Sequence, residues 1–313
     1  MENYLVAMAV FAGVYGVLAL SMNLIWGVGG MINLGLAGFY AIGGYASALL
    51  TLKLGLPIPV GMACAAAISA LIGAAAAVLT ARLQGDYLAI VTLGLAELIR
   101  LVASNEIWLT NGTDGLSGIP GPWRGTISPT AFNLVFFAIV LIALIVLYAL
   151  MARLAASPFG RVLRAIREDE LIASVAGKNV LSFKIRAFAL GAALTGFAGA
   201  LYAHYSSYIA PDVFLPIVTI YVILAVAIGG VGNMRGAVLG AFIVIALGEA
   251  TRFAVGYLGV LGSAQAAAVR EGLIALTLII VLNVRKEGLL PERSPVFKAP
   301  ISAAQTDAEA RRA

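Results

Sequence analysis

The chain has little charge and few of the residues that build catalytic or metal sites. Only 11% of its 313 residues are charged, whereas soluble domains carry about 25%. It contains one cysteine, Cys64, and one histidine, His204. One cysteine excludes an intrachain disulfide, and these two residues leave little from which to build a zinc site, a haem site or a histidine-centred triad. We therefore expect no metal site and no catalytic residues in this chain.

The shortage of charge accompanies an excess of apolar residues. Hydrophobic residues make up 62% of the chain, and the mean hydropathy is +1.01. A water-soluble fold of this size cannot bury so much apolar surface, and intrinsic disorder requires the opposite composition. The sequence therefore predicts an all-α, polytopic transmembrane helical bundle.

Nine apolar runs are candidates for membrane-spanning helices, which need about 20 residues each. They cover residues 4–26, 31–52, 58–81, 87–102, 131–151, 185–205, 214–230, 236–255 and 269–284. The run 87–102 is short and carries Glu97 and Arg100, so we interpret it as tilted, broken or partly re-entrant. The glycines of residues 27–30 mark a second place where the chain could fold back within the membrane before completing a turn between two spans. The prediction is about nine spans, in a range of 8–10.

The basic residues indicate how the bundle is oriented. With nine spans and an external N-terminus, fifteen of the 20 Lys and Arg residues fall on the inner side and four on the outer side. This is the asymmetry that positive-inside topology produces. The net charge of +5 is therefore a topology signal and not a sign of nucleic-acid binding, and the C-terminus is expected in the cytoplasm.

Two connections are long enough to have roles of their own. The external connection, residues 103–130, carries Trp108, Asp114, Gly115 and a Pro-Gly-Pro run, which indicate an ordered loop. The internal connection, residues 152–184, is rich in charge. The tail, residues 291–313, is polar and is expected to be flexible.

Small residues recur every four positions in two apolar runs. Gly232, Gly236 and Gly240 form one series, and Gly199 belongs to another. This spacing places small residues on one helix face, where a neighbouring backbone can approach closely. We expect tight helix packing; the alternative is a pore lining that slides or opens.

No nucleotide-binding device is recognisable. The Gly-Val-Gly-Gly run at residues 27–30 has no preceding strand, which a dinucleotide fingerprint requires, and the chain has no P-loop motif. If transport is driven by ATP, another subunit must therefore bind the ATP.

The internal segment 157–179 is the most informative part of the sequence. Ser157 and Pro158 predict a helix start, and Gly177 predicts its end. Between them lie three basic residues followed by three acidic residues: Arg161, Arg164, Arg167, Glu168, Asp169 and Glu170. A single amphipathic helix of this kind either lies on lipid headgroups or docks onto a cytoplasmic partner. The acidic block argues against anionic lipid, but the residues alone leave both alternatives open.

Charged residues inside a span are candidates for function. Glu97 and Arg100 are three positions apart and are expected to pair on one helix face. Together with Thr92 they are either part of a translocation path or structural, and ion pairs near span ends are more often structural. A proton-coupled carrier would need a carboxylate or histidine nearer the middle of a span.

Four separated motifs resemble one known family. They are residues 85–94 (GDYLAIVTLG) with Glu97 and Arg100, residues 111–120 (NGTDGLSGIP), residues 160–161 with 165–170 (GR and AIREDE), and residues 229–233 (GGVGN). In this order they resemble the permeases of branched-chain amino acid ABC transporters, of the LivM type. The resemblance covers residues 23–248 and extends in pattern to residue 284.

The resemblance implies an architecture and a set of partners. Residues 1–290 would form a transmembrane permease domain of an ABC importer in the bacterial inner membrane, paired with a LivH-type permease. Two cytoplasmic ATP-binding subunits would hold ATP and magnesium, and a periplasmic protein would deliver the substrate to the loop 103–130. The segment 157–179 would be the coupling helix that docks onto an ATP-binding subunit.

The implied function is import of branched-chain or related hydrophobic amino acids by alternating access, without an ATPase site in this chain. Permeases for urea and short amides resemble the same family, so they are the first alternative for the substrate. A stand-alone secondary transporter or channel is the second alternative.

Overall fold

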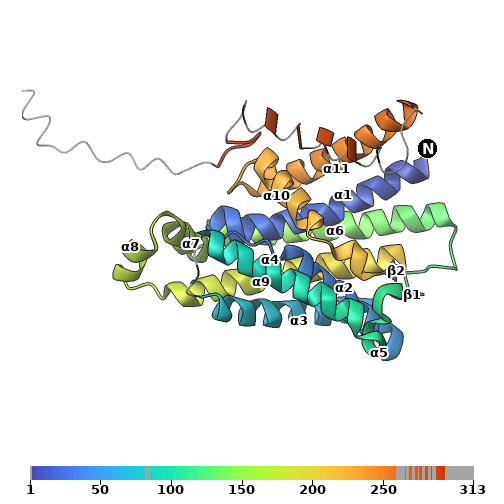
Figure 1. Ribbon diagram of the computed structural model, residues 1–313, viewed down its shortest axis with the longest axis horizontal. Helices are drawn as coiled ribbons and strands as arrows, with labels where there is room; N and C mark the ends of the chain where they lie inside the picture. Colours follow the sequence, from blue (N-terminus) through green and yellow to red (C-terminus); the bar gives the residue numbers. More distant parts are fainter. Residues whose placement is uncertain are drawn as a thin grey trace, which may run out of the picture.

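The computed structural model describes residues 2–81, 83, 85–258, 265, 268–269, 272–273, 275–276, 279–280, 283 and 287–292. Long helices lie side by side in these residues, which confirms the expected all-α bundle (Figure 1). They are α1 (Glu2–Met22), α2 (Leu36–Lys53), α3 (Ile58–Leu79), α4 (Gly85–Asn105), α6 (Pro129–Ala156), α9 (Val180–Ser206), α10 (Ile217–Gly229) and α11 (Met234–Leu258). The shorter elements are α5 (Ile107–Thr110), α7 (Pro158–Glu168), α8 (Glu170–Val175), β1 (Leu116–Ser117), β2 (Tyr208–Ile209), a π-helix (Asn23–Val28) and two 3₁₀ turns (Gly112–Asp114 and Pro211–Phe214).

Seven stretches of the described residues are long and apolar enough to cross a membrane, and they follow α1, α3, α4, α6, α9, α10 and α11. Helix α2 is not among them, although its 18 residues reach roughly 27 Å at 1.5 Å per residue. It packs against α3, α4 and α9, and most of its side chains are buried. A helix enclosed by protein does not contact lipid, so it needs less hydropathy. Of the nine expected spans, the run 269–284 is described only in part, because half of its residues lie outside the described residues.

The expectation for the run containing Glu97 and Arg100 is narrowed. Of the tilted, broken and partly re-entrant forms, the broken one is excluded, because α4 continues from Gly85 to Asn105. The two charges form an ion pair on one face, which lowers their cost within an apolar helix.

Helices α2, α3 and α9 pack most closely, and small residues make this possible. A Cβ atom on Gly43 would lie 2.0 Å from the Gly196 carbonyl oxygen, and one on Gly199 would lie 2.1 Å from that of Tyr40. Backbone therefore meets backbone where α2 crosses α9, as is typical of membrane helices.

A second close contact joins α10 to α11. A Cβ atom on Gly240 would lie 1.8 Å from the Ala225 carbonyl oxygen, and one on Gly236 would lie 2.4 Å from that of Gly229. Gly232 does not extend this face. It lies in the turn before α11 with a φ of +86°, a conformation that favours glycine.

Helices α2 and α10 meet at their N-terminal turns. The Ala37 amide of α2 donates a hydrogen bond to the hydroxyl of Thr219 in α10, at 3.0 Å. Before α2, the π-helix ends at Val28 and the backbone is non-helical up to Gly35, so the irregularity expected near residues 27–30 takes this form. Helix α10 has only 13 residues, about 20 Å, and follows a 3₁₀ turn.

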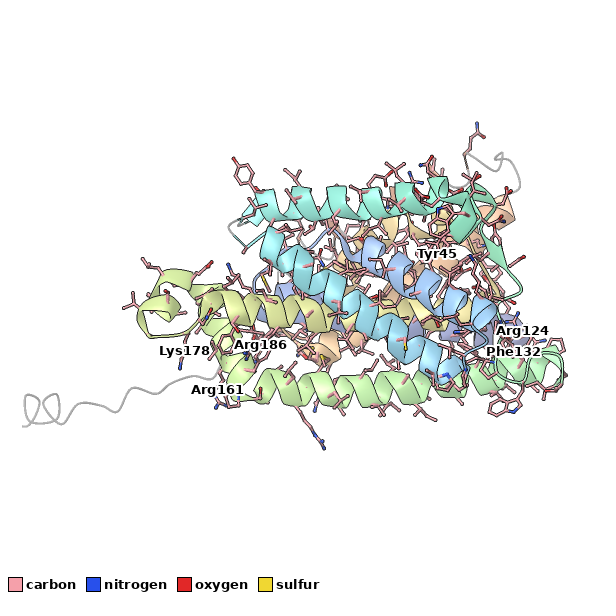
Figure 2. All side chains as sticks on the ribbon, turned by 90° about the horizontal axis from the view of Figure 1, so that it is seen from below. Tyr45, Arg124, Phe132, Arg161, Lys178 and Arg186 are labelled. Atoms are coloured by element: carbon pink, nitrogen blue, oxygen red, sulfur yellow. The ribbon has the colours of Figure 1, made fainter. Side chains whose placement is uncertain are left out.

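The two ends of the bundle differ in content. Helices α7 and α8 project from one end, and α5, β1 and β2 lie at the other (Figure 1). Arg161, Lys178 and Arg186 lie at the α7–α8 end, and Arg124 lies at the opposite end (Figure 2).

Candidate functional site

The charged segment after α6 folds as two helices, whereas the sequence predicted one. Asp169 stands between α7 and α8 with φ −156° and ψ +111°, and its carboxylate accepts a hydrogen bond from the Ile172 amide at 2.9 Å. An aspartate in this position caps the N-terminus of the next helix. Ser157 occupies the predicted cap position of α7, but its hydroxyl donates to the Leu154 carbonyl instead, at 2.6 Å.

Helix α7 is fastened to the end of the bundle by its apolar side. Leu163 and Ile166 are buried, and Gly160 lies so close to α6 that a Cβ atom there would be 2.2 Å from the Ala155 carbonyl oxygen. The exposed Arg161 donates to the Ala156 carbonyl at 3.2 Å. The two helices of the segment therefore form a hairpin, residues 158–175, whose base is fixed and whose tip projects.

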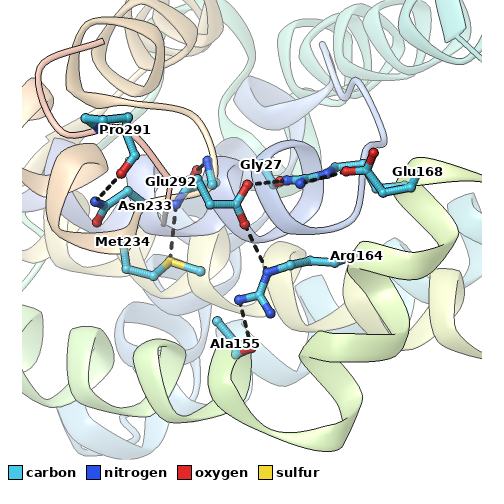
Figure 3. Close-up of polar contacts among 11 residues, drawn as sticks. Gly27, Ala155, Arg164, Glu168, Asn233, Met234, Pro291 and Glu292 are labelled. Atoms are coloured by element: carbon cyan, nitrogen blue, oxygen red, sulfur yellow. Dashed lines mark hydrogen bonds and ion pairs between the residues drawn. The ribbon is translucent and has the colours of Figure 1, made fainter. Parts of the chain in front are cut away.

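The predicted basic residues of α7 divide between bundle and solvent. Arg164 turns towards the bundle and contacts Glu292 (Figure 3). Arg167 contacts the same carboxylate, whereas Arg161 is exposed. Burial alone would lower the pKa of Arg167. Its hydrogen bonds with Glu292 and Glu168 outweigh burial, so the pKa is raised above its usual value. Arg167 therefore stays charged and is held by its partners.

The three acidic residues have three different surroundings. The Glu168 side chain is 74% exposed and contacts its neighbour Arg167 at 3.1 Å. Asp169 caps α8, and Glu170 forms an ion pair of 2.6 Å with Lys184 at the start of α9. The acidic block is therefore divided between solvent, a helix cap and a contact that ties α8 to α9.

The projecting tip of the hairpin, helix α8, exposes apolar side chains. Leu171, Ile172 and Val175 of α8 are 73%, 67% and 83% exposed. Of these three, Ile172 lines a groove of about 490 Å³, together with Val162, Ala165, Ala173 and charged residues from α7 to Lys178. Exposed apolar residues beside a groove are typical of a surface that receives a partner.

The loop of residues 103–130 is ordered, as the sequence predicted. Gly115 has a φ of +73° and lies against β2, because a Cβ atom there would be 2.2 Å from the Ile209 carbonyl oxygen. The Asp114 carbonyl accepts a hydrogen bond from the Tyr208 hydroxyl at 3.1 Å. Trp108 is 75% exposed, and its carbonyl accepts from Lys53 at 3.2 Å. The loop therefore presents Trp108 on a backbone that α2 and β2 hold in place.

The single histidine has a structural role that the sequence did not predict. His204 is buried in α9 and contacts the Ser47 hydroxyl at 2.8 Å and the Pro120 carbonyl oxygen at 2.6 Å. It therefore links α2, α9 and the external loop. Its lone occurrence in an apolar run was the only signal in the sequence, and such a signal does not reveal its partners.

The intramembrane residues form two separate contacts. Arg100 donates to Glu97 at 2.9 Å and lies 4.0 Å from Asp212 in the turn before α10. The Thr92 hydroxyl accepts from the Leu34 amide at 3.0 Å and is buried. Glu97 and Arg100 thus belong to the C-terminal half of α4, whereas Thr92 fixes the chain that enters α2.

Within the described residues, no group of three His, Cys, Asp or Glu residues is arranged to hold a metal ion.

The comparisons with known proteins agree on one family. The model of the family described as branched-chain amino acid transport system / permease component matches residues 4–282. The chain is 32% identical to the LivM permease protein of the Salmonella typhimurium high-affinity branched-chain amino acid transport system, over 94% of this chain and 71% of that protein. For Escherichia coli K12 LivM the identity is 32%, over 96% of this chain and 73% of the relative. No solved structure matches the chain.

More distant relatives include a second kind of permease. The probable LivM protein of Methanocaldococcus jannaschii is 28% identical, over 92% of this chain and 93% of that protein. The LivH permease protein of E. coli K12 is 25% identical, over 88% of this chain and 91% of the relative.

A bundle of membrane-spanning helices with a charged hairpin at one end defines a multi-pass helical permease. More particularly, the chain belongs to the family of permease components of branched-chain amino acid transport systems.

Proposed function

We propose that this chain is the LivM-type permease subunit of an ATP-driven importer for branched-chain amino acids in the inner membrane. The names of its LivM and LivH relatives support this substrate class. A LivH-type permease supplies the second half of the pathway, and two cytoplasmic ATP-binding subunits hold ATP and magnesium. A periplasmic binding protein selects and delivers the amino acid. This chain itself hydrolyses no ATP.

The hairpin of α7 and α8 is the observation that carries the proposal. Its base is packed on α6 while its tip exposes Leu171, Ile172 and Val175 beside a groove. In the proposed transporter the hairpin docks onto an ATP-binding subunit, with Arg161, Glu168 and Asp169 at the rim of the contact. Closure of the ATP-binding subunits then displaces the hairpin, and the spans rearrange.

The proposed topology places the hairpin and the C-terminus in the cytoplasm. The external loop, with Trp108, Asp114 and Gly115, receives the binding protein. The permease domain, residues 1–290, comprises the membrane-spanning part, and the polar tail follows it.

Reconstitution tests the transport function. Proteoliposomes that contain this chain, its partner permease and the ATP-binding subunits should take up leucine only with ATP and the binding protein. Leucine, urea and short amides are compared as competitors in the same assay. If urea competes most strongly, urea replaces branched-chain amino acids as the proposed substrate. Uptake by liposomes that hold this chain alone, without ATP, would show a self-sufficient carrier or channel and contradict the proposal.

Cysteine labelling tests the topology. In a Cys64→Ala background, Ser174→Cys lies on the exposed surface of α8, and Thr113→Cys lies on the exposed external loop. An impermeant thiol reagent added to cells with a permeabilised outer membrane should label the second variant and not the first. Ready labelling of Ser174→Cys would reverse the topology.

A further inference from the structure

A glutamate beyond the bundle holds helix α7 by two ion pairs. The Glu292 carboxylate accepts from Arg164 Nε at 3.0 Å and from Arg167 Nη1 at 2.8 Å (Figure 3). The Glu292 side chain is only 20% exposed. Solvent therefore screens these contacts less than it screens an open surface pair. The shared carboxylate fixes the side of α7 that faces the bundle.

The segment that carries Glu292 is itself attached to α10. The amides of Leu289 and Leu290 donate to the carbonyls of Ile228 and Gly229 at 2.8 and 2.9 Å, and the Asn233 side chain donates to the Pro291 carbonyl at 3.2 Å. Gly230 has a φ of +122°, and a Cβ atom there would lie 2.1 Å from the Leu290 carbonyl oxygen. Glu292 is therefore held in position by backbone contacts, independently of the arginines.

Arg167 also reaches the π-helix that follows α1. Arg167 Nη1 donates to the Gly27 carbonyl, and a Cβ atom on Gly30 would lie 2.6 Å from the Arg167 side chain. The Gly232 amide donates to the buried side chain of Asn23 at 2.8 Å. The glycines of residues 27–30 thus allow α7 and the α10–α11 turn to approach the π-helix.

We propose that Glu292 is a positioning residue that holds α7 on the π-helix and on the end of α10, and that it transmits the movement of the hairpin to α10. The inference rests on the proposed coupling role of the hairpin. Residues 287–292 and α10 are joined by backbone hydrogen bonds, so a displacement of α7 acts on the C-terminal end of α10. The other end of α10 bonds to the first turn of α2 through Thr219 and Ala37, which extends the route into the bundle.

The test compares Glu292→Gln with Glu287→Gln in the complete transporter. Glu287 is an exposed glutamate of the same segment and is the matched control. Leucine uptake per ATP hydrolysed should fall about fivefold in Glu292→Gln, because two charge-assisted hydrogen bonds are weakened. Glu287→Gln should match wild type. Glu292→Asp keeps the charge and should recover part of the leucine uptake per ATP hydrolysed. Assembly with the ATP-binding subunits should stay unchanged in all three variants.

Hydrogen exchange gives a second readout that does not depend on transport. The amides of α7 should exchange about fivefold faster in Glu292→Gln than in wild type or Glu287→Gln, because α7 loses its attachment. Unchanged exchange in α7 would overturn the positioning role. Faster exchange with unchanged leucine uptake per ATP hydrolysed would show that Glu292 does not transmit the movement of the hairpin to α10. If neither wild type nor Glu287→Gln shows ATP-dependent uptake, the proposed function fails, and exchange still decides the positioning role.

Discussion

The two ends of the bundle are held together by different kinds of contact. At the end that carries α5, β1 and β2, Gly115 lies against Ile209, β1 pairs with β2 and the His204 side chain bonds to the Pro120 carbonyl. At the other end, ion pairs between Glu292 and the side chains of Arg164 and Arg167 add to the backbone contacts. Backbone contacts have little freedom to change partners, whereas long charged side chains can exchange them. The difference indicates that the attachments of α7 can rearrange more readily than those of the loop that contains β1.

The largest effect on stability is expected from adding a methyl group at Gly115. Gly115 and Gly118 have nearly the same φ, +73° and +75°, but only a Cβ atom on Gly115 would collide with β2. Gly115→Ala should destabilise the protein by about 2 kcal/mol more than Gly118→Ala, because both variants are strained by the positive φ but only Gly115→Ala is also overpacked. Thermal unfolding in detergent measures the difference. Equal losses in the two variants would show that the β1–β2 contact does not restrict this position.

A large effect without loss of stability is expected at the hairpin tip. Val175→Asp places a charge on an 83% exposed apolar position of α8. Recovery of the ATP-binding subunits with the permease should fall about tenfold, which is the size of effect that a residue in the centre of an interface produces. Leu181→Asp, at an exposed position of α9 near the same end, is the control. A fall in both variants, or in neither, would contradict docking by the tip.

The acidic block should give smaller effects that differ among its members. Glu170→Lys removes the ion pair with Lys184 and places two positive charges together, so thermal stability should fall by about 1 kcal/mol. Glu168→Lys leaves the fold unchanged, because that side chain is mostly in solvent, but should reduce uptake per ATP hydrolysed about threefold. Normal uptake per ATP in Glu168→Lys would make this residue part of a solvated face without a coupling role.

The smallest effect is expected from the helix cap inside the hairpin. Asp169→Ala removes the acceptor for the Ile172 amide, and such a change costs about 1 kcal/mol of helix stability. Hydrogen exchange should increase in α8 but not in α7. Asp169→Asn keeps an acceptor and should exchange like wild type, so equal acceleration in both variants would show that charge, and not capping, is the cause.

Local sequence patterns predicted most of the long helices and one ion pair. The apolar runs anticipated α1, α3, α6, α9 and α11, because hydropathy over about 20 residues reports directly on lipid exposure. Spacing also predicted the Glu97–Arg100 pair, since residues three apart share a helix face. The break at Asp169 was missed because the charge pattern on either side fits one continuous helix.

Composition, hydropathy and short motifs are properties of neighbouring residues, so they predict an all-α membrane bundle, its charged segment 157–179 and its family. Contacts between distant parts of the chain set which glycines meet backbone, why α2 needs less hydropathy and which residues pair with Arg167. Glu292 lies 125 residues from Arg167 along the chain. No local period relates the two, and their ion pair exists because α10 and residues 287–292 bring one carboxylate beside α7.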